Sequence, residues 1–163
     1  MTFLIKTHLP RLVLLLLICV LPNLTACTQK FISSYDEKTD NAVTALQRTV
    51  EAFLVNLENI TTTPDCSYEH QKAFYNNIKV EISALKVRTD AIDKNELTSK
   101  QVAALSDSLK TLEQLHQIKQ PAGKCFTPGE IEPLRQNLNI TFSSILKLEL
   151  AKKREGHNSS ESK

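Results

Sequence analysis

The side chains best suited to chemistry lie near the ends of two predicted helices. Glu113 and His116 are three residues apart, so they share one face of a helix, and Glu69 and His70 lie together near the start of another. Carboxylates and imidazoles bind transition metals, and di-iron helical bundles use Glu-x-x-His twice, with two further glutamates that face inward. In this chain the motif occurs once. We therefore predict no metal site and no cofactor.

Structural roles explain the same residues without a metal. His116 continues an apolar stripe and lies where a cation offsets the helix dipole, while Glu69 suits a helix start. The sequence also lacks a Gly-rich phosphate loop, Gly-x-Ser-x-Gly, His-Glu-x-x-His and Cys-x-x-Cys. Because no nucleophile and base can be paired from their spacing, we predict that the chain is not an enzyme.

The N-terminal residues have the layout of a signal peptide. Lys6 and Arg11 precede an apolar run, residues 12–21, that Pro22 ends. This run of ten residues rises only ~15 Å as a helix, about half of a bilayer core, so it is a poor membrane span. Small side chains and a cysteine follow in the tetrapeptide Leu24-Thr25-Ala26-Cys27.

This tetrapeptide resembles the lipobox of bacterial lipoproteins, in which an aliphatic residue and small residues precede a modified cysteine. The resemblance covers residues 1–27. It implies cleavage before Cys27, attachment of a diacylglycerol to the Cys27 thiol, and acylation, for example with palmitate, of the new N-terminus. Because Thr28 rather than Asp follows the cysteine, the resemblance favours the outer over the inner membrane, with the domain facing the periplasm. An uncleaved N-terminal anchor is the alternative.

The remainder of the chain resembles the small helical lipoproteins of Gram-negative envelopes, a likeness that implies no activity. The expected organisation is a signal peptide over 1–26, a tether over 27–34, a helical bundle domain over 35–155 and a disordered tail over 156–163. Residues 27–163 carry 18 basic and 18 acidic side chains. Because nucleic-acid binding needs clustered positive charge, we predict no nucleic-acid partner.

Two cysteines remain once Cys19 is assigned to the apolar run and Cys27 to the lipid. An even pair in an exported domain favours one disulfide, Cys66–Cys125, because the compartment is oxidising. Two separate buried thiols, as in a cytosolic protein, are the alternative. The disulfide would close a loop of about 60 residues, for which chain entropy gives about 4 kcal/mol of stabilisation.

Proline and glycine divide the domain into helices. The stretches without either residue are long, which favours helix, and the prolines and glycines gather in the connections between them. Pro133 leaves the start of the fourth helix open between residues 128 and 133, because an internal proline removes a hydrogen bond. The expected helices cover residues 35–60, 66–92, 99–118 and 128–153.

Side chains that could cap these helices precede three of them. In a capping box, a Ser or Thr hydroxyl and a Glu or Gln three residues later each bond the other's backbone N–H. The predicted boxes are Ser34 with Glu37, Thr98 with Gln101, and Thr127 with Glu130.

Each expected helix carries one apolar stripe with three- and four-residue spacing, which buries one face. The stripes are Val43, Leu46, Val50, Phe53, Leu57 and Ile60; Phe74, Tyr75, Ile78, Ile82, Leu85 and Ile92; Val102, Leu105, Leu109, Leu112 and Leu115; and Ile131, Leu134, Leu138, Phe142, Ile145 and Leu148. No segment alternates with period two. We therefore predict an all-α, up-down-up-down four-helix bundle with no sheet.

In this topology the first and third connections lie at the same end of the bundle, so Cys66 and Cys125 can meet. Cys27 is close to the opposite end, which we expect to face the membrane, and the disulfide then lies at the end away from it. Lys152, Lys153 and Arg154 would finish the last helix near the membrane. They either complement the helix C-terminus or contact lipid head groups.

A predicted membrane anchor together with the lack of a recognisable catalytic motif favours a non-enzymatic envelope lipoprotein. Such a protein would contact another envelope protein or a second copy of itself. Two alternatives stay open. One is a small-ligand or metal-binding module that uses the end with residues 66, 70, 113, 116 and 125. The other is an inhibitor or immunity-type lipoprotein that neutralises a periplasmic toxin or enzyme.

Overall fold

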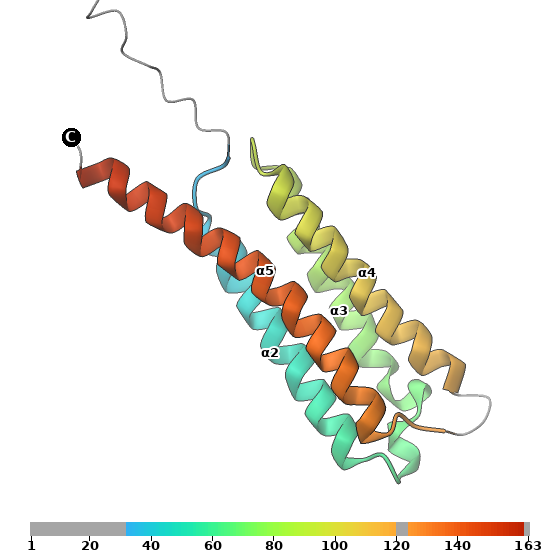
Figure 1. The fold of residues 1–163 in the computed structure, drawn as a ribbon. Coiled ribbons are helices and arrows are strands. Elements are labelled where there is room, and N and C mark those ends of the chain that lie inside the picture. The colour runs from blue at the N-terminus through green and yellow to red at the C-terminus, as the bar shows by residue number, and fades with distance from the viewer. Residues whose placement is uncertain (1–31, 120–123, 162–163) are drawn as a thin grey trace, which may run out of the picture. The chain divides into compact units, whose positions relative to one another are not determined.

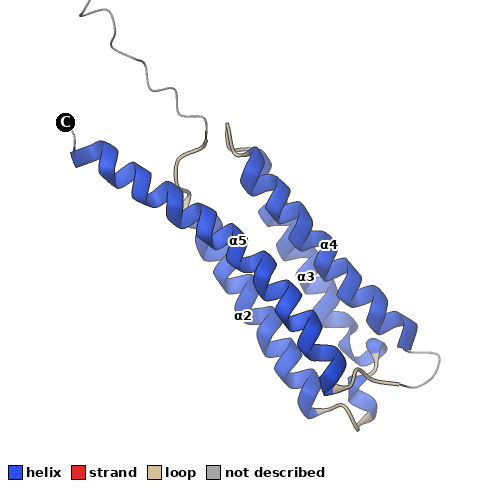
Figure 2. Cartoon of the chain, in the orientation of Figure 1, coloured by secondary structure: helices blue, strands red, loops and turns tan. Residues whose placement is uncertain are grey.

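The computed structural model describes residues 32–119 and 124–161 of the chain. Over these residues the structure contains helices and no strand (Figure 2). A short 3₁₀ turn, η2 (Pro64–Cys66), precedes the second long helix. The long helices are α2 (Glu37–Asn59), α3 (Tyr68–Asp90), α4 (Glu96–Lys119) and α5 (Pro128–Glu161) (Figure 1). The predicted all-α fold is confirmed.

Contacts at one end of the bundle fix the direction of the helices. Asp36, directly before α2, bonds Arg88 in the last turn of α3, with 2.7 Å between Nε and Oδ2. Thr98 in the first turn of α4 donates a hydrogen bond of 2.8 Å to Glu149 of α5. We call this the tether end, because the chain enters the bundle here. The start of α2 thus meets the end of α3, and the start of α4 meets the C-terminal half of α5.

The opposite end, which we call the disulfide end, shows the complementary contacts. Tyr68 in the first turn of α3 donates to Glu113 near the end of α4. Arg135 near the start of α5 pairs with Glu58 near the end of α2 at 2.7 Å. Each helix therefore runs opposite to the next, as the ribbon shows (Figure 1). These are the contacts of the expected up-down-up-down bundle.

The predicted apolar stripes form the core. The buried members are Val43, Leu46, Val50, Phe53 and Leu57; Tyr75, Ile78, Ile82 and Leu85; Val102, Leu105, Leu109 and Leu112; and Ile131, Leu138, Phe142 and Ile145. Five others are only half-buried: Ile60, Phe74, Ile92, Leu134 and Leu148. Leu115 is 38% exposed, because the next inward position of α4 is His116.

Two of the three predicted capping boxes are wrong. The residue that caps α2 is Asp36 rather than Ser34, and its carboxylate accepts from the backbone N–H of Thr39 at 3.0 Å. The Asp36 carboxylate also forms an ion pair with Arg88, and an uncharged serine hydroxyl cannot form one. Helix α4 begins three residues earlier than expected, so Thr98 lies inside the helix and is buried.

The start of α5 shows half of the third predicted box, because the Thr127 hydroxyl donates to Glu130 Oε2 instead of accepting from the Glu130 backbone N–H. The backbone N–H of Thr127 donates to Glu130 Oε2 at 2.8 Å, and Pro128 takes the first helical position, where its missing N–H costs no helical bond. The open choice between residues 128 and 133 is settled at 128, with Pro133 inside the helix. The expected end at residue 153 is wrong. The helix continues to Glu161, so the segment expected to be a disordered tail is helical to that residue.

Candidate functional site

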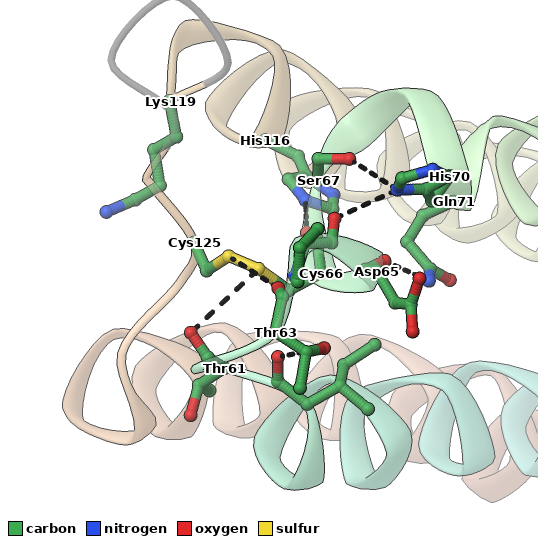
Figure 3. The surroundings of a disulfide bond; sticks show 12 residues. Thr61, Thr63, Asp65, Cys66, Ser67, His70, Gln71, His116, Lys119 and Cys125 are labelled. Atoms are coloured by element: carbon green, nitrogen blue, oxygen red, sulfur yellow. Dashed lines mark hydrogen bonds between the residues drawn. A yellow bond between two sulfur atoms is a disulfide. The ribbon is translucent and has the colours of Figure 1, made fainter.

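The disulfide end is built around the Cys66–Cys125 bridge (Figure 3). Cys66 ends the η2 turn, which Pro64 begins, and Cys125 lies just before α5. The two Cα atoms are 5.7 Å apart, a usual separation for a disulfide. The predicted pairing is confirmed, and it ties the connection between α2 and α3 to the connection between α4 and α5.

His116 holds the disulfide loop onto the bundle. Its imidazole is fully buried, and Nε2 lies 2.7 Å from the carbonyl oxygen of Cys66 (Figure 3). Because a carbonyl only accepts, Nε2 carries the proton, and Nδ1 accepts from the Tyr75 hydroxyl at 2.7 Å. Both ring nitrogens are therefore occupied. Burial lowers the pKa of His116 below its ordinary value of 6.5, so the ring is neutral at physiological pH.

The buried neutral imidazole predicts a pH dependence of stability. In the unfolded chain His116 binds a proton below about pH 6.5, whereas in the folded chain it does so only at lower pH. The free energy of unfolding should therefore be highest above that pH and decrease as the pH falls through it, with a slope approaching ~1.4 kcal/mol per pH unit. Urea denaturation at a series of pH values measures this slope.

Two variants separate the titration of His116 from a general loss of stability. His116→Gln cannot titrate and should lose this part of the slope. Leu112→Ala empties a fully buried position one turn away and should lower stability while keeping the wild-type slope. A His116→Gln protein with the full wild-type slope would show that another group is responsible.

The residues that could have formed a metal site are not assembled into one. His70 is exposed and its Nδ1 lies 2.9 Å from the Pro64 carbonyl oxygen, while His116 uses both nitrogens as above. Glu69 is exposed on the first turn of α3. Among residues 32–119 and 124–161, no three His, Cys, Asp or Glu side chains are close enough to bind one metal ion.

Glu113 has a different environment from His116, although the two lie on one helix. Its side chain is 7% exposed, and Oε1 accepts from the Tyr68 hydroxyl at 2.9 Å and from Lys79 Nζ at 2.7 Å. It lines a groove of about 340 Å³ between α3 and α4. The apolar wall of this groove is formed by Tyr75, Ile78, Ile82 and Leu109. The site thus joins a buried carboxylate to an apolar surface.

The tether end contains a second polar cluster that sequence reasoning missed. Every core stripe ends here in a buried polar residue, four positions beyond the last buried apolar one. We call this set, with one further residue from α5, the polar layer: Thr39, Thr89, Thr98, Glu149 and Lys152. The spacing of the stripes was sufficient to place all of these residues in the core. A search for apolar stripes does not find these residues, because their side chains are polar.

Lys152 and Glu149 form a buried ion pair at the centre of the polar layer. Their side chains are 2% and 1% exposed, and Nζ is 2.7 Å from Oε1. Lys152 also donates to Asn95 Oδ1 and to Thr98 Oγ1, at 2.7 and 2.8 Å, which uses all three of its N–H groups. The expectation that Lys152 faces lipid or ends the helix is therefore wrong. The next residue, Lys153, lies over the Tyr35 ring at 5.0 Å.

The chain before α2 is fastened to this layer. Ser33 is buried, its N–H donates to the Lys94 carbonyl at 2.9 Å, and its hydroxyl donates to Asn95 Oδ1 at 2.8 Å. Asn95 therefore accepts from both Ser33 and Lys152. The segment predicted as a tether is thus held in place from Ser33 onward.

Comparison with known proteins adds no family. No protein-family model, curated protein or solved structure matches this chain. Within the part of the chain that the structure describes, no helix is long and apolar enough to cross a membrane. Cys27 and the residues predicted to form a lipobox and a signal peptide lie outside the described residues.

Proposed function

We propose that the chain is a bacterial lipoprotein, anchored through acylated Cys27 in the outer membrane and facing the periplasm, that acts by contacting another envelope protein or a second copy of itself. The observation that carries this proposal is Leu24-Thr25-Ala26-Cys27 at the end of a short apolar run. The Cys66–Cys125 disulfide supports it, because such bonds persist in oxidising compartments such as the periplasm.

The position of Ser33 limits how far the domain can stand from the membrane. Ser33 is the sixth residue after Cys27, and a fully extended chain over six residue steps spans about 20 Å. With Cys27 at the lipid surface, the tether end would lie within that distance of it. The disulfide end would face the periplasm, at the far end of the helices.

An exposed apolar pair supports a contact role. Val80 and Val87 lie seven residues apart on one face of α3, and each is 67% exposed. Aliphatic side chains exposed to this degree gain free energy when a partner covers them. A photo-crosslinking residue in place of Val80 should capture a partner or a dimer in intact cells. Recovery of neither product would contradict the interaction part of the proposal.

Cys27→Ala tests the anchor. The variant should lose acylation and processing, so that the protein leaves the detergent phase in partitioning experiments and its intact mass matches an unmodified chain. Cys19→Ser is the matched control, because Cys19 lies in the apolar run and should not affect processing. Three acyl chains, at about 0.8 kcal/mol per buried CH₂, hold a protein essentially permanently. Unchanged membrane association and mass in Cys27→Ala would overturn the proposal.

A further inference from the structure

We propose that the groove between α3 and α4 binds a small organic ammonium ion with an apolar body, and that Glu113 is its counter-ion. This inference does not depend on the membrane anchor. The groove of about 340 Å³ is within the size range of small-molecule sites, which combine apolar walls with a few polar groups. The walls and the charged rim are formed by Tyr75, Ile78, Ile82, Leu109, Lys79 and Glu113.

The carboxylate of Glu113 is positioned for a ligand. The side chain is 7% exposed, and the Tyr68 hydroxyl, itself on a buried residue, holds Oε1 at 2.9 Å. The second oxygen, Oε2, takes part in neither the Tyr68 nor the Lys79 bond. A carboxylate in such a place needs a positive partner, because a buried unpaired charge is costly.

Lys79 now supplies that positive charge, and its geometry makes it replaceable. Its ammonium group lies 2.7 Å from Glu113 Oε1, but its side chain is 58% exposed. Because the Lys79 ammonium group already contacts solvent, its return to water costs little, and the released lysine regains side-chain entropy. A ligand ammonium can therefore take the place of Nζ without leaving Glu113 unpaired. The contact with Lys79 shows that Glu113 Oε1 accepts a hydrogen bond from an R–NH₃⁺ group.

The same features select the class of ligand. A neutral molecule would leave Glu113 paired with Lys79 and would gain binding free energy only from contact with the apolar wall. An anion would be repelled by the carboxylate. A cation gains both the carboxylate and the wall of Tyr75, Ile78 and Leu109. Lys110 is also at the rim, but it is exposed, so solvent and salt screen its charge.

Titration with phenethylammonium chloride, followed by methyl NMR, tests the proposal on the folded domain. The Ile78, Ile82 and Leu109 methyl signals should shift with saturation. Phenethyl alcohol, the neutral analogue, should bind at least about tenfold more weakly. Equal affinities of the two probes, or shifts that map to another part of the bundle, would overturn the proposal.

Three variants decide the role of the two charges. Lys79→Met removes the competing ammonium and should tighten phenethylammonium binding about three- to tenfold. Lys72→Met is the matched control, one heptad earlier on α3 and outside the groove, and should bind as the wild type does. Glu113→Gln should lose the preference for the cation. If this last variant does not fold, the comparison of Lys79→Met with Lys72→Met still decides, and unchanged or weaker binding by Lys79→Met overturns the proposal.

Discussion

Replacing Lys152 with methionine is expected to destabilise the domain by about 3–5 kcal/mol. Methionine fills a similar volume, so the loss comes from charge rather than packing. Without Lys152, the Glu149 carboxylate stays buried at 1% exposure with Thr98 and a distant Asp36 N–H as its remaining donors. The free energy of unfolding from urea denaturation at neutral pH measures the effect.

Lys153→Met is the matched control for this experiment. Lys153 is the next residue of α5, it is exposed, and it contacts the Tyr35 ring, so its replacement should cost no more than about 1 kcal/mol. Adding Glu149→Leu to Lys152→Met removes both charges and should restore much of the lost stability. Equal losses in the two lysine variants would show that the buried ion pair does not stabilise the fold as described.

The helical fold could be predicted because its information is local and repeated. The stripes that run from Val43 and from Val102 place one apolar residue inward on every turn. Pro64 marks the break between α2 and α3, although Pro133 and Gly129 lie inside α5. Antiparallel neighbours follow from short connections. Each of these rules involves residues close together in the sequence. Most of the stripe residues that they predicted are buried, and the core also contains Leu54, Tyr68 and Phe126, which lie outside the predicted stripes.

The polar layer could not be predicted in the same way, although its positions could. Thr98 and Glu149 continue the stripes, but the sequence shows neither that they meet nor that Lys152 neutralises the acid. Three basic residues in succession suggested instead that the helix ends there. That interpretation failed because helix α5 continues past them to Glu161. Burial of a polar side chain depends on partners from other helices, which a single stripe does not reveal.

The candidate site shows the same limit. The spacing of Glu113 and His116 correctly places them on adjacent turns near the disulfide, but it suggests a common role. In the structure one ring nitrogen of His116 is hydrogen-bonded to the Tyr75 hydroxyl and the other to the Cys66 carbonyl. Glu113 instead lines the groove and pairs with Lys79. The tyrosines that bond these residues, Tyr68 with Glu113 and Tyr75 with His116, both come from α3. The register of α3 against α4 is set by tertiary packing, so the spacing of residues within α4 does not reveal it.

Removal of the disulfide is the second large effect that we expect. Cys66→Ala and Cys125→Ala should each lower the free energy of unfolding by about 2–5 kcal/mol, and by similar amounts, because either one opens the same loop. The double variant should lose little more than either single variant, since the two residues act as one unit. Urea denaturation of all three proteins, beside the reduced wild type, measures these losses.

The pH dependence of the free energy of unfolding shows whether the loop stays against the bundle when the disulfide is absent. Cys125→Ala leaves the Cys66 backbone unchanged, so the bond from His116 Nε2 to the Cys66 carbonyl can persist. If the loop stays docked, His116 remains buried and neutral, and stability still decreases as the pH falls below about 6.5. If the loop leaves, the imidazole gains access to water and the pH dependence of stability becomes weaker.

We expect the pH dependence to persist in Cys125→Ala, because Pro64 and the η2 turn hold the loop independently of the sulfur atoms. Additive losses in the double variant would contradict the pairing itself, whereas a flattened slope would show that the disulfide, rather than the turn, keeps His116 buried.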